Sequence, residues 1–304
     1  MELLRQLGAL GDRLAARWSR ANYDEAAFPA LAVGELERAR LHEGEGGAGF
    51  DAAALLRHLV TATPAFEQGP GDFGEPPICV YRGRGFYIEV LFWLDGTTTL
   101  HDHAFSGAFQ VLVGGSVHAR YAFRQEVRVR STLRLGEVTN TSVELLRRGA
   151  VRPIVAGPDF IHALFHLERP SLSLVVRTVN EHDRLPQLSY LPPGIAFDAF
   201  EVDRLRDRRL QALTLLHASD PAALHALLEE LARDADLPML FHALNHVATP
   251  FHDVAALAHY VALAEARHGE LARRMLPAFH QQVRRLHLTQ RRGAVQDPGL
   301  RYFL

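Results

Sequence analysis

The sequence predicts an α+β protein in which a β-sandwich or barrel lies between two helical segments. Apolar residues recur at helical spacing up to about Leu59, short β-type segments follow from Ile78 onward, and helical patterns return after Pro193. Recurrence every three or four residues is typical of amphipathic helices, whereas short runs of β-branched and aromatic residues between turn residues are typical of strands. At 304 residues the chain is long enough for more than one domain.

The N-terminal helical segment is expected to cover residues 1–75. A first helical run starts at the N-terminus, and a second begins near Ala52. The loop Gln68–Pro77 cannot continue a helix, because its prolines lack the backbone N–H and its glycines favour turns. The chain therefore changes structural type at this loop.

The middle segment, residues 76–195, carries the strand patterns. Each short run is rich in Val, Ile, Phe, Tyr and Leu and is bounded by Gly, Asp, Asn or Pro. Short strands at this spacing predict a sandwich or barrel. The expected strands are Ile78–Arg82, Phe86–Trp93, Ala108–Val113, Ser116–Phe123, Val127–Leu133, Val138–Leu146, Val151–Val155, His162–Leu167 and Leu172–Val179.

The C-terminal segment, residues 196–304, is expected to form an all-α domain. Asp220 and Pro221 form a good N-cap and first-turn pair for one of its helices. The helical patterns cover about 202–217, 222–233, 238–247, 250–268 and 270–288.

Composition and charge exclude several classes of function. The chain is 48% apolar and 22% charged and has a net charge of −2, so no overall positive field favours nucleic acid or anionic lipid. Cys79 is the only cysteine, which rules out an internal disulfide and a cysteine-built zinc site. Neither a secretory leader nor an apolar run of transmembrane length is present, so we expect a cytoplasmic protein.

Three histidines form a candidate metal site. His101 and His103 are two residues apart, so in a strand both imidazoles point to one face, toward the barrel interior. A transition metal needs at least three protein ligands, and His162, which follows the Gly157-Pro158 turn on a distant strand, can supply the third. A single histidine on an apolar face is usually a core residue, but this combination of motifs indicates that the three histidines are metal ligands.

These two motifs resemble those of the cupin superfamily, over roughly Ile78 to Val179. The family pattern is a glycine, His-x-His, an acidic residue and a glycine in the first motif, and a glycine followed by a histidine in the second. The resemblance implies a jelly-roll β-barrel with one metal ion. The acidic ligand expected four or five positions after His103 is absent, because Gly107 and Ala108 stand there. The implied ligand set is therefore three histidines without a carboxylate.

Three-histidine sites in this superfamily are similar to those of the thiol dioxygenases, of which cysteine dioxygenase is the best-known member. The run from Arg82 through Trp93 to His103 resembles the corresponding run of that family. There an arginine near the start of the barrel holds the substrate carboxylate in a bidentate fork. The resemblance assigns this role to Arg82, with Arg84 as a substitute.

Two positions depart from that family. Ala108 stands where the animal enzymes have a cysteine that cross-links to a tyrosine, and Arg177 stands at about the position of the histidine in a Ser-His-Tyr relay. Bacterial members also lack the cross-link, but loss of the relay argues against L-cysteine itself as the substrate. Arg177 either faces the pocket, where it could bind an acid group, or points outward into solvent. Arg82 and Arg177 are the candidate catalytic residues.

The resulting hypothesis is a mononuclear non-haem Fe(II) dioxygenase that acts on a small substrate such as a thiol carboxylic acid, together with dioxygen. Imidazole also binds Zn, Mn and Ni, so an isomerase or lyase that uses one of these metals stays open. A third alternative is a metal- or ligand-binding cupin whose helical domain contacts a partner. No nucleic acid or membrane is expected as a partner, and a homodimer is left open.

Two further histidines lie near the motifs. His166, four residues after His162, could support the ligands from behind. His118 and Arg120 share one face of a strand by the period of two, and the pattern favours a solvated outer face for this pair over the mouth of the pocket.

Overall fold

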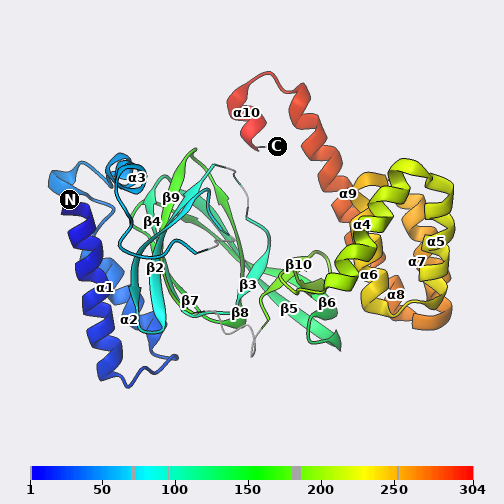
Figure 1. Ribbon diagram of the computed structural model, residues 1–304, viewed down its shortest axis with the longest axis horizontal. Helices are drawn as coiled ribbons and strands as arrows, with labels where there is room; N and C mark the ends of the chain where they lie inside the picture. The colour runs from blue at the N-terminus through cyan, green and yellow to red at the C-terminus, as the bar shows by residue number, and fades with distance from the viewer. Residues whose placement is uncertain are drawn as a thin grey trace. The chain divides into compact units, whose positions relative to one another are not determined.

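The computed structural model describes residues 2–69, 73–94, 96, 98–179, 186–251 and 253–303 (Figure 1). The chain divides into two compact units. Unit 1 comprises Met1–Tyr121 and Asn140–Pro186, and unit 2 comprises Ala122–Thr139 and Gln187–Leu304. The two long strands of a hairpin are thus shared between the units.

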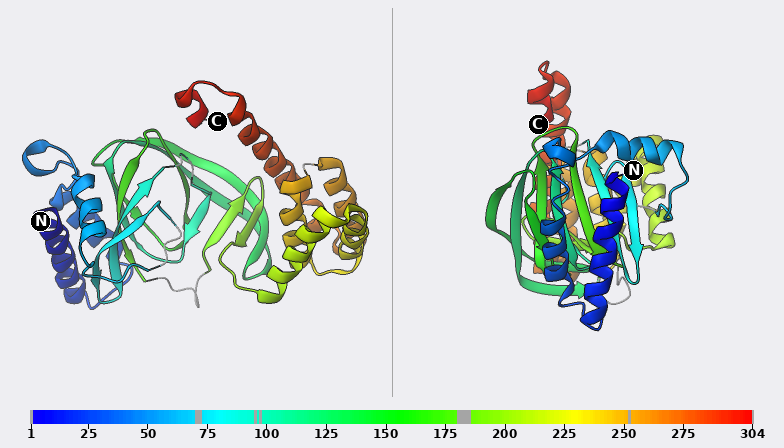
Figure 2. Two further views of the ribbon diagram at one scale, coloured as in Figure 1. Left: turned by 45° about the horizontal axis from the view of Figure 1, so that its top comes forward. Right: turned by 90° about the vertical axis from the view of Figure 1, so that its left-hand side faces the viewer.

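Three helices begin unit 1: α1 (Glu2–Arg20), α2 (Phe28–Ala39) and α3 (Ala52–Thr61). Helices α1 and α2 cover the outer face of one β-sheet, as the right-hand view of Figure 2 shows. Leu7, Leu10 and Leu14 of α1 are fully buried, and they form one core with apolar residues of the sheet. Burial of this apolar stripe is the main force that holds the helices on the sheet.

The first sheet has the strand order β1-β2-β9-β4-β7. Every pairing in it is antiparallel. Its strands are β1 (Pro77–Gly83), β2 (Phe86–Trp93), β4 (Gly107–Val113), β7 (Val151–Ile154) and β9 (Ser171–Thr178).

The second sheet has the order β10-β11-β6-β5-β8-β3 and is closed. Its strands are β3 (His101–His103), β5 (Ser116–Arg130), β6 (Leu133–Leu146), β8 (Gly157–His166), β10 (Leu188–Leu191) and β11 (Ile195–Asp198). The first sheet thus contains the order β2-β9-β4-β7 and the second the order β3-β8-β5-β6, which is the jelly-roll arrangement.

Unit 2 combines the ends of β5 and β6 with β10, β11 and the C-terminal helices. Its core joins Leu133, Leu135 and Ile195 to apolar residues of the helices. The helices are α4 (Arg204–Ser219), α5 (Pro221–Asp234), α6 (Leu237–Phe251), α7 (Val254–His268), α8 (Glu270–Arg273), α9 (Leu276–Arg291) and α10 (Pro298–Phe303).

The predicted fold class is confirmed: a closed antiparallel β-barrel follows N-terminal helices and precedes C-terminal helices. The boundaries after residues 75 and 195 stay a prediction. Among the described residues, no helix combines the length and apolar character that a membrane span requires.

Several expected element boundaries differ from the structure, and two of the differences have a local backbone cause. The strands expected at Ser116–Phe123 and from Val127 are one strand, β5, because Gln125 takes a left-handed φ of 51° and bends the chain without ending the strand. The helix expected over 270–288 is divided into α8 and α9. Pro277 lies in the first turn of α9, where its missing N–H is tolerated, and it could not continue a preceding helix.

Candidate metal centre

The structure brings the three predicted ligands together inside the barrel. His101 and His103 lie on β3, and His162 lies on the neighbouring strand β8, directly opposite His101 in the antiparallel register. One ligand atom from each residue lies within 4.8 Å of the others. The three side chains are only 4%, 5% and 3% exposed in the order of the sequence. A buried group of this kind can hold one metal ion.

The ring nitrogens converge at a spacing that suits a shared cation. Nε2 of His103 lies 2.9 Å from Nε2 of His162. Two nitrogens that each lie about 2.1 Å from one ion, at right angles, are about 3.0 Å apart. Without an ion, the same contact needs one proton between two nitrogens, while Nδ1 of His103 is buried with no hydrogen-bond partner among the described residues. The donor set therefore fits a metal ion.

Hydrogen bonds orient two of the three rings. Nδ1 of His101 donates to the carbonyl oxygen of Thr99 at 2.6 Å, which leaves its Nε2 free to act as a ligand. Nδ1 of His162 lies 3.0 Å from Nε2 of His118. The other nitrogen of His162, Nε2, faces His103 in the cluster.

The burial of these imidazoles keeps them neutral. Burial lowers the pKa of His101 to about 4. The pKa of His103 and that of His162 are held well below the usual value, first by burial and then by the positive charge of neighbouring groups. A neutral imidazole has a free lone pair, so all three residues are ready to bind a metal at neutral pH.

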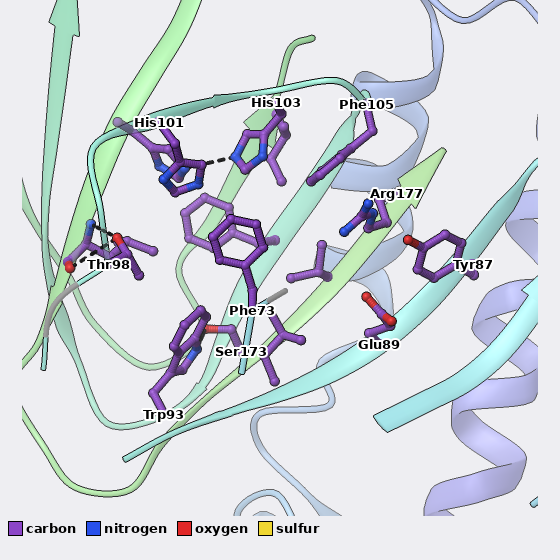
Figure 3. Close-up of a pocket in the computed structure, with 16 residues that line it drawn as sticks. Phe73, Tyr87, Glu89, Trp93, Thr98, His101, His103, Phe105, Ser173 and Arg177 are labelled. Atoms are coloured by element: carbon purple, nitrogen blue, oxygen red, sulfur yellow. Dashed lines mark hydrogen bonds between the residues drawn. The ribbon is translucent and has the colours of Figure 1, made fainter. Parts of the chain in front are cut away.

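A pocket of about 780 Å³, part of it open to solvent, lies beside the three histidines. Figure 3 shows His101 and His103 on one side of it, with Arg177 and Tyr87 on another side. Half of the lining side chains are apolar, and they are Phe73, Leu91, Trp93, Phe105, Phe109, Ile154, Leu164 and Val175. Besides the histidines, the polar lining residues are Tyr87, Glu89, Thr98, Ser173 and Arg177. Such a site suits a small ligand with an apolar body and one or two polar groups.

Of the arginines singled out in the sequence, Arg177 alone lines this pocket. It lies on β9 opposite Tyr87 of β2, and its guanidinium carbon is 3.7 Å from the ring centre of Phe105. Arg82 is exposed on the edge strand β1, with its guanidinium carbon 5.6 Å from the ring centre of Tyr87. Arg84 is also exposed and stacks on Tyr23.

Sequence analysis missed a hydrogen-bonded group behind His162, which consists of His118, Glu144 and Arg152. His118 was expected on an outer face, but it is only 1% exposed. Alternation in a strand separates two faces without showing which face is inside. In β5 the polar face that holds Ser116 and His118 is the buried one, because the barrel interior at this point is polar.

His166 lies apart from the metal cluster. Its Nδ1 is 3.0 Å from Oγ of Ser116 and 2.8 Å from Oγ of Ser171, and its ring stacks on Trp93 at 4.6 Å. Burial lowers the pKa of His166 to about 4. Its contacts support the barrel wall next to the pocket.

No protein-family model matches the sequence, and no curated protein matches it either. Several solved structures are similar to part of the chain. A cupin-2 domain containing protein from Shewanella frigidimarina is 16% identical, with 38% of this chain and 85% of that chain covered and a TM-score of 0.25. A hydroquinone 1,2-dioxygenase from Sphingomonas sp. TTNP3 is 16% identical, with coverages of 35% and 67% and a TM-score of 0.27. A sugar phosphate isomerase of the cupin superfamily from Silicibacter pomeroyi is 16% identical, with coverages of 40% and 73% and a TM-score of 0.24.

Proposed function

We propose that this protein is a mononuclear non-haem Fe(II) dioxygenase that acts on a small substrate with an acid group, such as a thiol carboxylic acid. One observation carries the proposal: three buried histidines converge beside a pocket that an arginine also lines. Glycine and alanine at positions 107 and 108 leave this ligand set without a carboxylate.

The three imidazoles His101, His103 and His162 would hold the metal. Because all three are neutral, the ion keeps its full charge of 2+, and an anionic substrate group is favoured next to it. An Fe(II) ion at this site would supply electron transfer between the substrate and dioxygen. Zn, Mn and Ni accept the same donors, so ligand type alone does not select iron.

Arg177 would bind the acid group of the substrate. Its guanidinium offers a planar fork of donors that matches a carboxylate. The apolar wall around Phe105 and Trp93 would pack against the rest of the substrate. Oxidation of a thiol would add both atoms of one dioxygen to the sulfur and give a sulfinic acid.

Metal analysis tests this proposal. We would measure metal by elemental mass spectrometry on protein purified without a histidine tag, for wild type, His101→Ala and His162→Ala. His259→Ala is the matched control, because His259 is an exposed histidine of α7. We expect about one iron per chain in wild type and in the control, and loss of it in both site variants. No metal in wild type under any loading condition would overturn the proposal.

Oxygen uptake with thiol acids is the second step. Uptake that requires iron, and that His162→Ala abolishes, supports a dioxygenase. Stoichiometric zinc, manganese or nickel without oxygen uptake would indicate a Lewis-acid isomerase or lyase instead of a dioxygenase. Metal binding without any turnover would favour a sensor.

A further inference from the structure

A chain of hydrogen bonds runs from the half-buried ion pair of Arg152 and Glu144 to Nδ1 of His162. Nδ1 of His162 is 3.0 Å from Nε2 of His118, and Nδ1 of His118 is 3.0 Å from Oε1 of Glu144. Arg152 donates from Nε to Oε1 of Glu144 at 2.9 Å and from Nη2 to Oε2. The four residues come from β8, β5, β6 and β7, so both sheets contribute to the chain of hydrogen bonds.

The chemistry of the groups fixes the direction of every hydrogen bond. Arginine only donates and an ionised carboxylate only accepts, so both oxygens of Glu144 act as acceptors. Nδ1 of His118 must then carry the proton of that ring, which makes its Nε2 an acceptor. Nδ1 of His162 must donate to it, and Nε2 of His162 is left with a free lone pair.

The free lone pair of His162 lies where the metal is expected. Nε2 of His162 is the atom that faces Nε2 of His103. His118 and His162 are 1% and 3% exposed, so water cannot compete for their hydrogen bonds. The pair Arg152–Glu144 lies at the half-buried end, where the pKa of Glu144 is lowered to about 2, chiefly by the hydrogen bond from Arg152.

We propose that Glu144 and His118 are positioning residues that set the tautomer and ring orientation of His162 and so strengthen metal binding. This inference rests on the proposed metal site. Neither residue touches the metal or the substrate; each acts through the next residue. Outer partners of this kind typically change metal affinity by about 10–100-fold.

Replacement of Glu144 by leucine removes the acceptor of His118. Oε1 of Glu144 accepts from both Arg152 and His118, so a glutamine oxygen could keep both contacts, whereas Glu144→Leu offers no acceptor. Nδ1 of His118 then lacks its partner, so the tautomer of His118, and through it that of His162, is no longer fixed. We expect weaker metal binding by about 10–100-fold with an unchanged fold.

Two substitutions at His118 separate hydrogen bonding from packing. His118→Phe keeps a ring but has no acceptor for His162, and we expect a loss of metal affinity similar to that of Glu144→Leu. His118→Gln can donate its NH₂ to Glu144 and accept from His162 with its oxygen, so we expect it to restore affinity to within about threefold of wild type. Glu137→Leu, at an exposed carboxylate on the same strand as Glu144, is the matched control.

The experiment is a Zn²⁺ competition titration with a chromophoric chelator on wild type and the four variants. Nitrogen NMR of ¹⁵N-histidine-labelled, zinc-loaded protein reads the tautomers directly. We expect Nδ1 protonated on both His118 and His162 in wild type. Thermal unfolding of each variant verifies that it is folded.

The outcomes are distinguishable. If wild type binds zinc through the three histidines, and Glu144→Leu and His118→Phe bind it equally tightly, the inference is overturned while the proposed site stands. An Nε2-protonated His118 in wild type would also overturn it. If wild type binds no metal, the proposed site fails, and the inference fails with it.

Discussion

Gly107 lies directly against the backbone of Val176. A Cβ at Gly107 would be only 1.9 Å from the carbonyl oxygen of Val176 on β9. The neighbouring residue Ala108 is fully buried in the core formed with the N-terminal helices. Neither position can direct a carboxylate toward the histidines without displacing a strand, which gives the missing acidic ligand a structural reason.

We therefore expect Gly107→Ala to destabilise unit 1. The added methyl group would force β4 away from β9, and overpacking of this kind costs about 1–3 kcal/mol. Denaturant unfolding followed by tryptophan fluorescence measures the change, because Trp18 and Trp93 both lie in unit 1. Gly8→Ala in α1 is the control, since no atom lies within 4 Å of its added Cβ. Equal stability of Gly107→Ala and wild type would contradict this account.

Arg177→Gln should weaken binding of an anionic substrate and leave metal content unchanged. Loss of a charge-assisted hydrogen bond corresponds to about 10–100-fold in kcat/KM. Arg82→Gln is the matched control, because Arg82 is exposed outside the pocket lining. Steady-state kinetics with a thiol acid and with its uncharged amide make the test specific. A larger loss of kcat/KM in Arg82→Gln than in Arg177→Gln would show instead that Arg82 binds the substrate carboxylate.

Stability should fall as the pH is lowered. Burial lowers the pKa of His166 from 6.5 to about 4, so between these values the unfolded chain binds a proton that the folded protein does not. This difference removes about 2 kcal/mol of unfolding free energy between pH 7 and pH 5. Denaturant unfolding at several pH values should show that the unfolding free energy depends less steeply on pH in His166→Gln than in wild type. An identical slope in both proteins would refute this assignment.

Glu35 should contribute to the packing of α1 on α2. Its carboxylate is fully buried and accepts hydrogen bonds from Nε of Arg13 and Nη1 of Arg17, both at 2.8 Å. We expect Glu35→Gln to reduce the unfolding free energy by about 1–3 kcal/mol, because the two arginines lose a charged acceptor. Glu37→Gln, exposed on the same helix, should change it little. Thermal unfolding of the two variants side by side gives the comparison.

Much of the fold could be predicted because local patterns encode it. Leucines at helical spacing, short β-branched runs between turn residues, and the Asp220-Pro221 pair each specify an element through nearby residues alone. Local patterns did not predict that β5 continues through the bend at Gln125 or that the last long helical run is divided near Pro277. One strand can tolerate a left-handed residue, and one helical pattern can contain a break.

The sequence by itself determined the fold class and the grouping of His101 and His103, since residues two apart in a strand share a face. Only the tertiary structure decided which face of β5 is buried, that Arg177 rather than Arg82 lines the pocket, and that His118, Glu144 and Arg152 line up behind His162. The physical reason is that alternation defines two faces of a strand, whereas the pairing of distant strands selects the inner one and the side chains that meet there.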